Sequence, residues 1–326
     1  MIRYTIFGES HGPAIGVVIT GLPCGLDLDM DAISVEMARR APGQDNTSTP
    51  RKEKDAVEIL SGVFEGKTTG TPLCGVIYNT DTRSKDYSKL KELPRPSHAD
   101  YTASVRYGGY SDYRGGGHFS GRLTAPLVFA GALAKQLLNQ QGIVIESKID
   151  LLGGVKNPTA EQIEEIILAA KAEKDSVGGA IQCTVSGVPA GFGAPDLGEN
   201  AEGIFAKHLF AVPGVKGIEF GAGFDFASMR GSEANDPFYM DGDTVKTRTN
   251  HAGGINGGIT NGMPLTFRVA MRPTPSIGKL QQTVSLSAKT NEELAIEGRH
   301  DPCIVKRALP VIEAAAALAT CELLNL

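Results

Sequence analysis

The sequence predicts an α+β fold in a single domain that spans residues 1–326. Strand-like segments follow one another in pairs more often than they alternate with helices, which favours antiparallel sheets over βαβ units. Hydrophobic residues make up 41% of the chain, enough for a sizeable core. No repeat or clean linker divides the sequence, so we expect all elements to share one domain.

Two pairs of strands are predicted in the first quarter of the chain. Residues 2–8 and 14–21 are short, rich in β-branched residues and bounded by glycine, as strands are. They flank a loop at residues 8–12 with the sequence GESHG. Residues 57–66 and 73–79 have a similar character and form the second expected pair.

A helix is predicted at residues 31–40, between these pairs. Asp31 is the expected N-cap, and the Ala-Pro-Gly that follows the segment is a strong stop signal. Arg39 and Arg40 therefore lie in the last turn. With the cations among residues 51–54 they form a basic cluster in a chain of net charge −5.

A glycine-rich turn leads into the next predicted helix. Residues 112–122 read DYRGGGHFSGR, and the helix at 123–138 tolerates Pro126 because this proline lies near its first turn. Free backbone N–H groups and Arg122 would meet at the helix N-terminus, where the helix dipole favours a phosphate or carboxylate. The turn is therefore a candidate anion site.

Three segments are predicted as loops, and glycine or charge dominates each of them. Residues 42–55 and 79–100 are polar and lack a hydrophobic period, while residues 250–262 are dense in glycine. Glycine supplies 40 of the 326 residues, or about 12%, against roughly 7% in typical proteins. Long loops in a compact domain are often functional, so these segments are expected near a site.

Helices and strands alternate less regularly in the second half. A helix at residues 158–174 follows a Pro-Thr start signal, and a last helix at 304–324 has Asp301 as its expected N-cap and Pro302 at its first position. Three further strands are expected from their β-branched and aromatic residues: 179–188, 215–224 and 264–271.

The composition argues against several classes of protein. Charges of both signs are mixed, so the sequence gives no reason to expect a nucleic-acid or membrane partner. The five cysteines are widely spaced and form no CxxC pair, which favours free thiols and no zinc site. No signal peptide and no apolar run of about eighteen residues is found, so we expect a soluble cytoplasmic protein.

Histidines are the first candidates for chemistry. The chain has only six, and four of them lie in polar or glycine-rich segments: His11, His98, His118 and His251. An imidazole in such a loop is often a simple surface or hydrogen-bonded residue. Its protonation can also change near neutral pH, which suits acid or base catalysis.

Formal matches to common motifs fail on their context. GESHG fits the GxSxG pattern of α/β-hydrolases, but only one strand precedes Ser10 and no histidine follows Asp301. GGGHFSG lacks the third glycine of GxGxxG, whose place Ser120 takes, and no GxxxxGK[ST] sequence occurs. Serine hydrolase, dinucleotide-binding and P-loop folds therefore have little support.

Ten segments, taken in order, resemble the chorismate synthase family across nearly the whole chain. Any one of them is weak evidence, but ten in the same order with similar spacing make an accidental likeness very improbable. They are FGESHG, ARRAPGQ followed by TPRKEKD, ILSGVFEGKTTGTP, NTDTRSKDYS, RPSHADYTASVRYG, SDYRGGGHFSGRLTA, VKGIEFGAGF, NHAGGINGGITNG, RPTPS and GRHDPC.

The resemblance implies a fold in which helices are sandwiched between two antiparallel β-sheets, and a homotetrameric assembly. It implies a lyase that removes phosphate from 5-enolpyruvylshikimate 3-phosphate (EPSP) by 1,4-anti elimination to give chorismate, in the shikimate pathway to the aromatic amino acids. It also implies reduced FMN (FMNH2) as a cofactor that undergoes no net oxidation. An external flavin reductant would then be a partner.

Functional residues of the family fall on named positions of this sequence. His11 matches a histidine proposed to act at the departing phosphate, and His98 one proposed to protonate or hydrogen-bond the flavin. Asp301 matches an aspartate thought to take part in removing the C6 proton. The resemblance assigns substrate contacts to Ser10, Arg39, Arg40, Arg122 and Arg299. It assigns cofactor contacts to His118, Phe119, Ser120, Pro213, Gly214, Asn250, His251, Gly257, Arg272, Pro273, Thr274, Pro275, Ser276 and Arg299.

The sequence departs from the family pattern at several of these places: Ala41, Asn46, His118, Phe119, Gly121 and Leu123. Ala41 and Asn46 lie in or near a region linked with NADPH-dependent flavin reduction in bifunctional members. We therefore expect a monofunctional enzyme that does not use NADPH. Two other functions stay open, a flavin- or phosphate-binding module without chemistry and a flavin oxidoreductase. Retention of His11, His98 and Asp301 together argues against the binding module.

Overall fold

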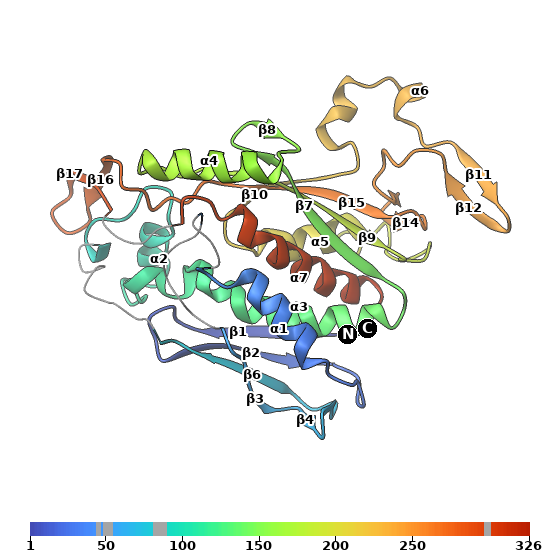
Figure 1. Ribbon diagram of the computed structural model, residues 1–326, viewed down its shortest axis with the longest axis horizontal. Coiled ribbons are helices and arrows are strands. Elements are labelled where there is room, and N and C mark those ends of the chain that lie inside the picture. The colour runs from blue at the N-terminus through green and yellow to red at the C-terminus, as the bar shows by residue number, and fades with distance from the viewer. Residues whose placement is uncertain (44–46, 48–54, 81–89, 297–300) are drawn as a thin grey trace.

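The computed structural model describes residues 1–43, 47, 55–80, 90–296 and 301–326, and it packs helices against antiparallel sheets (Figure 1). The α+β class predicted from the sequence is confirmed. None of the helices in these ranges is long and apolar enough to cross a membrane.

The first sheet has four antiparallel strands in the order β1-β2-β6-β3. β2 is central in this order, and its side chains at Ile15, Val17 and Ile19 are almost completely buried. Their spacing of two residues directs all three to the same face of the sheet. The strands are β1 (Arg3–Gly8), β2 (Ala14–Thr20), β3 (Glu58–Ser61) and β6 (Leu73–Tyr78). Both predicted strand pairs of this region are present.

The second sheet has five antiparallel strands in the order β10-β15-β9-β7-β8. Buried residues of β15 lie directly opposite buried residues of β9, so one face of this sheet is continuous and apolar. The facing pairs are Leu265 with Val185, Phe267 with Cys183 and Val269 with Ile181. The strands are β7 (Val144–Leu152), β8 (Val155–Lys156), β9 (Gly179–Ser186), β10 (Val215–Phe220) and β15 (Leu265–Met271).

Helices lie between the two sheets (Figure 1). α3 contacts β2 and β6 of the first sheet and β7 of the second, while α7 contacts β7 and β9. Since both helices are packed on all sides, they are apolar around most of their circumference. The four large helices of this region are α1 (Met30–Arg40), α3 (Thr124–Asn139), α5 (Ala201–Phe210) and α7 (Val305–Leu323).

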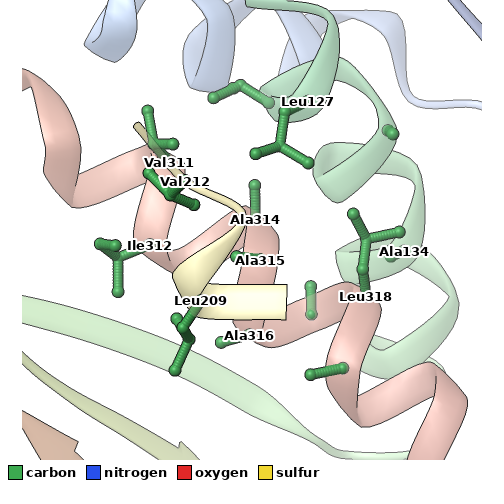
Figure 2. Packing of buried hydrophobic residues seen from close by; sticks show 14 of the residues in the cluster. Leu127, Ala134, Leu209, Val212, Val311, Ile312, Ala314, Ala315, Ala316 and Leu318 are labelled. Carbon is green, nitrogen blue, oxygen red and sulfur yellow. The ribbon is translucent and has the colours of Figure 1, made fainter. Parts of the chain in front are cut away.

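Small residues bring α3 and α7 close together. A Cβ atom added to Gly131 of α3 would lie 2.2 Å from Cβ of Ala314 in α7. Alanines continue along α7 at 315–317. Figure 2 shows Ala315 and Ala316 on α7 in the cluster that also contains Leu127 and Leu209. The contact therefore depends on the absence of side-chain volume at Gly131.

The remaining elements are short helices and hairpins around this core. The helices are α2 (Asp100–Arg106), α4 (Ala160–Ala172), α6 (Gly231–Ala234) and the 3₁₀ turns η2 (Arg114–Phe119), η3 (Gly121–Leu123) and η4 (Gly223–Ser228). The paired strands are β4 (Val63–Phe64) with β5 (Lys67–Thr68), β11 (Phe238–Asp241) with β12 (Thr244–Thr247), β13 (Ile255–Asn256) with β14 (Ile259–Thr260), and β16 (Gln281–Ser285) with β17 (Thr290–Leu294).

Two predicted helix caps are wrong. Asp29, not Asp31, caps α1 by accepting a hydrogen bond from the backbone of Ala32, because the helix begins one residue earlier than expected. Ile304 occupies the cap position of α7 and makes no side-chain cap bond, since the helix starts only at Val305. Asp301 therefore lies outside the helix, and its side chain bonds Arg307.

The structure also contains elements that the sequence patterns did not indicate. β7 and α5 were not predicted, and the glycine-dense segment expected as a loop at 250–262 contains the hairpin β13–β14. The turn of this hairpin is Gly257-Gly258, and both glycines have positive φ, as a two-residue hairpin turn requires.

A buried ion-pair cluster ties four elements of the core together. Glu313 of α7 accepts hydrogen bonds from Arg39 of α1 at 2.7 Å on each oxygen, from Lys135 of α3 at 2.6 Å and from Ser147 of β7 at 2.6 Å. Burial alone would raise the pKa of Glu313, but these partners outweigh it and hold the pKa at about 2. The carboxylate is therefore ionised at neutral pH.

Candidate active site

A cavity of about 250 Å³ opens where the ends of α1 and α7 meet the turns η2 and η3. Five guanidinium groups line the described part of its wall, those of Arg40, Arg95, Arg122, Arg272 and Arg307. Another part of the wall is apolar and is made by Val212, Met271, Ile304, Ala308 and Val311. Such a cavity suits a ligand that is flat and apolar at one end and anionic at the other.

Arg40 and Arg122 share a single buried counterion, Asp55. Arg40 donates to Asp55 at 2.7 Å, and Arg122 donates to its other oxygen. Further bonds fix both guanidiniums, from Arg40 to Thr124 at 3.1 Å and from Arg122 to Asn79 at 3.1 Å. The Asp55 side chain is fully buried, so a ligand in the cavity would contact the two arginines and not Asp55 itself.

The charges of this triad are set by burial and by one another. Burial would raise the pKa of Asp55, but Arg40 and Arg122 together hold it below its ordinary value. Burial, helped by the nearby charge of Arg307, lowers the pKa of Arg40 to about 10. Arg40 is therefore still a cation at neutral pH, and the triad carries positive charge toward the cavity.

His98 is held by an ion pair behind it. Its Nδ1 lies 2.6 Å from Oδ1 of Asp100, and Asp100 in turn accepts from Arg95 Nε at 2.7 Å and Nη2 at 2.8 Å. Arg95 also donates from Nη1 to the hydroxyl of Ser276 at 3.1 Å. Arg272 reaches the backbone carbonyl of Ser97. These bonds join the His98 segment to residues 272–276, which line the same cavity.

His11 and His98 lie against consecutive glycines of η2. A Cβ atom at Gly115 would lie 2.2 Å from Nδ1 of His11, and one at Gly116 would lie 3.2 Å from Nε2 of His98. Both glycines have positive φ, so a side chain at either position would be strained as well as crowded. Ser10 hydrogen-bonds Nδ1 of His11 at 3.1 Å. The two histidines are therefore brought together, from segments 87 positions apart in the sequence.

Asp301 lines the cavity and pairs with Arg307. Arg307 also donates from Nε to the backbone carbonyl of Arg40 at 3.0 Å, which fixes its position beside the Asp55 triad. Cations in the first turn of a helix are unfavourable toward its dipole. Arg307 is held there by Asp301 and by the carbonyl of Arg40, and it faces the cavity.

Cofactor residues predicted from the resemblance fall into two groups. Phe119, Ser120, Pro213, Gly214 and residues 272–276 line the cavity. The backbone N–H of Arg272 donates to the carbonyl of Gly214 at 2.9 Å, so two of these segments are joined directly.

The other predicted residues lie elsewhere or outside the described ranges. Arg39 is engaged in the Glu313 cluster, and His118 bonds the carbonyl of Gly8 at 2.9 Å; neither lines the cavity in the part of the chain that the structure describes. The same holds for three residues around the β13–β14 hairpin: Asn250, His251 and Gly257. Arg299 and Asn46 fall outside the described residues.

Sequence reasoning missed four charged residues of the site: Asp55, Arg95, Asp100 and Arg307. Arg95 and Asp100 flank His98 within the segment RPSHAD, so their proximity to the histidine was a usable signal. Arg307 was signalled by its position in the first turn of the last helix. Asp55 gave no signal, because only the tertiary fold brings Arg40 and Arg122 onto its two oxygens.

Comparison with known proteins agrees with this geometry. A sequence model of a family described as chorismate synthase matches residues 2–324. The chain belongs to the chorismate synthase family. The chorismate synthase of Methanosarcina mazei is 48% identical over 98% of this chain and 93% of its own length. That of Dehalococcoides mccartyi is 44% identical over 99% of this chain and 94% of its own length.

Solved structures give the same result. A crystal structure of a chorismate synthase superposes with a TM-score of 0.77 at 27% sequence identity, covering 99% of this chain and 91% of the other. Membership in the family supports chorismate synthase function for this chain. Within the described residues, no group of three or more metal-ligating side chains accompanies the cavity.

Proposed function

We propose that this chain converts EPSP to chorismate and phosphate by 1,4-anti elimination, with reduced FMN bound in the same cavity. The observation that carries the proposal is the convergence of five arginines and His98 on one cavity, with His11 held one residue away along η2. A substrate with a phosphate and a carboxylate needs several cations, and arginine binds both groups through two hydrogen bonds.

The cavity has the chemical character that a flavin mononucleotide requires. The isoalloxazine ring is flat and largely apolar, which fits the wall formed by Val212, Met271, Ile304 and Val311. The FMN phosphate would find Arg272, for which no carboxylate partner exists among the described residues, and the hydroxyls of Thr274 and Ser276. Reduced flavin, when bound, would lend an electron to the substrate and recover it, so that nothing is oxidised overall.

The arginines would orient the substrate and neutralise the departing phosphate. Arg40 and Arg122 are locked by Asp55, Thr124 and Asn79, so they lose little freedom when an anion binds. Preorganised cations stabilise charge that develops on a leaving group, because no reorganisation is needed at the moment of reaction. This is the largest contribution that we ascribe to the protein.

His11 and Asp301 would handle protons at the two ends of the elimination. The leaving phosphate gains charge as its bond to C3 breaks, and a proton or hydrogen bond from His11 would stabilise it. The bond from Ser10 holds the imidazole in position for this step. On the opposite side of the substrate ring, Asp301 would take part in removal of the C6 proton, with Arg307 fixing its carboxylate.

We also propose that flavin must reach this enzyme already reduced. Ala41 ends α1 through backbone bonds alone, from its N–H to the carbonyls of Met37 and Ala38, and offers no side-chain charge where the family commonly has arginine. A binding site for the phosphates of NADPH would lack that cation. NADPH with FMN but without a reductase should therefore give no turnover.

The direct test is anaerobic incubation of purified protein with EPSP and dithionite-reduced FMN. We expect chorismate and phosphate in equal amounts, with no net loss of reduced flavin. Consumption of reductant in proportion to product would indicate a flavin oxidoreductase instead. Binding of FMN and EPSP without any product would indicate a binding module.

A further inference from the structure

One ring nitrogen of His98 bonds a side chain of the protein, and the other lies near the cavity. Nδ1 lies 2.6 Å from Asp100, while the Cε1–Nε2 edge lies against Gly116 of η2. His98 lines the main cavity and also a second cavity of about 40 Å³, which Gly116 lines as well. A volume of this size has room for water.

Asp100 is held as a carboxylate. Arg95 gives it three hydrogen bonds, from Nε, Nη2 and the backbone N–H, at 2.7, 2.8 and 3.0 Å. Burial would raise the pKa of Asp100, but the bonds from Arg95 and His98 hold it well below the ordinary value. Nη2 of Arg95 also lies 3.0 Å from Nδ1, but the contact with Asp100 is shorter, at 2.6 Å. A carboxylate cannot donate, so we assign the proton of this short contact to Nδ1 of His98.

We propose that Asp100, clamped by Arg95, is a positioning residue that keeps the proton of neutral His98 on Nδ1 and leaves Nε2 as the proton-accepting atom at the cavity. This inference rests on the proposed function, in which His98 exchanges a proton with bound flavin. When Nε2 gains a proton, the imidazole becomes a cation and Asp100 offsets its charge; when the proton leaves, it passes to the ligand or to water in the second cavity.

Three charged groups face His98 and set how readily it is protonated. Burial has the largest effect and lowers the pKa of His98. The carboxylate of Asp100 raises this pKa, whereas the charges of Arg95 and Arg272 lower it. Removing Asp100 should therefore make His98 harder to protonate, and removing Arg95 should make it easier. The two changes have opposite signs, which general damage to the fold would not produce.

The test measures His98 itself, without cofactor. Deuterium exchange at imidazole C2–H, read by mass spectrometry, follows the protonation of each histidine in the intact chain. Asp100→Asn should move the His98 midpoint to lower pH, and Arg95→Gln should move it to higher pH. Asp150→Asn removes a similarly buried, arginine-paired carboxylate elsewhere, 14% exposed, and should leave the midpoint unchanged.

Turnover supplies the second readout. With EPSP and reduced FMN, Asp100→Asn should lose roughly 10²-fold in kcat, the lower range for proton transfer by a side chain, with little change in KM. Its pH profile should shift in the same direction as the His98 midpoint. If Asp100→Asn does not fold, Arg95→Gln still tests the inference, because its His98 midpoint should move to higher pH.

Two results would overturn the inference: an unmoved His98 midpoint in both folded variants, or an unchanged pH profile and kcat in Asp100→Asn. Failure of the proposed function is separate, because it would appear in the wild type as absence of chorismate. In that case the exchange midpoints would still report whether Asp100 controls His98.

Discussion

His11 and His98 are held on either side of one peptide unit, the one that joins Gly115 to Gly116. Their separation is thus set by a rigid, short piece of backbone and does not depend on a flexible loop. Both glycines adopt positive φ, so this arrangement is open only to residues without a side chain. In the function proposed above, both imidazoles would exchange protons from fixed positions.

His11→Ala should retain FMN binding but lower kcat by about 10² or more, the scale of a lost general acid. The reason is that the variant loses the imidazole proposed to act at the leaving phosphate, whereas the contacts proposed for FMN at Arg272 and Ser276 lie elsewhere in the cavity. Single-turnover kinetics with reduced FMN checks this. His208→Ala removes an equally buried imidazole, paired with Glu322, and should lower stability without this loss of kcat.

Asp301→Asn should also lower kcat by about 10². Asp301 does not cap α7, so the variant loses no helix cap. Weakening its charged bond with Arg307 should lower the free energy of unfolding by about 1.5–3 kcal/mol. Urea unfolding measured beside the kinetics separates the two effects. Near-normal turnover in a folded variant would remove Asp301 from the mechanism.

Several residues of the site could be predicted from the sequence, but the side chains with which they form ion pairs could not. His11 and His98 were identified from their segments, and the structure brings both to η2. The counterion of Arg40 and Arg122 was not found, because a buried aspartate that pairs with residues 15 and 67 positions away leaves no local pattern. Pairing partners are decided by tertiary packing, which a single sequence does not display.

At the scale of the elements, α3 and α7 pack closely at Gly131 and Ala314. Gly131→Val should destabilise the protein by about 1–3 kcal/mol, the usual cost of overpacking, because the added Cβ also meets backbone of α7 at 2.4 Å. Thermal unfolding measures the change. Gly231→Ala in α6 places a methyl group in open space and should leave stability nearly unaltered.

The Glu313 cluster makes the assembly of α1, α3, α7 and β7 sensitive to acid. The folded-state pKa of about 2 is below the ordinary 4.5, so ionised Glu313 contributes about 3 kcal/mol that is present above pH 4.5 and lost as the pH falls toward 2. The unfolding free energy of Glu313→Gln should therefore lie below wild type by a constant amount above pH 4.5. A difference that stays constant down to pH 2 would contradict the assignment.

Element boundaries show where sequence patterns stop being informative. The strands β1, β2, β9 and β15 and the helix α4 agree with prediction because their periodicity and flanking residues are strong. The cap of α1 was misplaced because Asp29 and Asp31 are equally good N-cap residues. Asp31 lies instead in the first turn, where its charge still favours the helix dipole.

At the scale of the whole molecule, the β11–β12 hairpin projects from the body (Figure 1), and one of its faces is apolar. Phe238, Met240 and Val245 share that face and are 68%, 62% and 53% exposed. Apolar residues grouped in this way usually meet another protein surface. They are consistent with the homotetramer that we propose.

Light scattering after size exclusion should give a mass four times that of the 34.3 kDa chain. Met240→Lys, which places a charge in the apolar face, should lower the mass if the hairpin lies in an interface. Lys246→Ala alters the opposite face of the hairpin and should not. A monomeric wild type would contradict the tetramer.

The shared aspartate of the cavity has a consequence for the release of product. An anion that enters meets two guanidiniums that stay bonded to Asp55, so part of their charge is already offset. When the phosphate leaves, both arginines keep the buried carboxylate as their partner. Binding is weaker than two bare arginines would give, and a dianion that would otherwise remain trapped can depart.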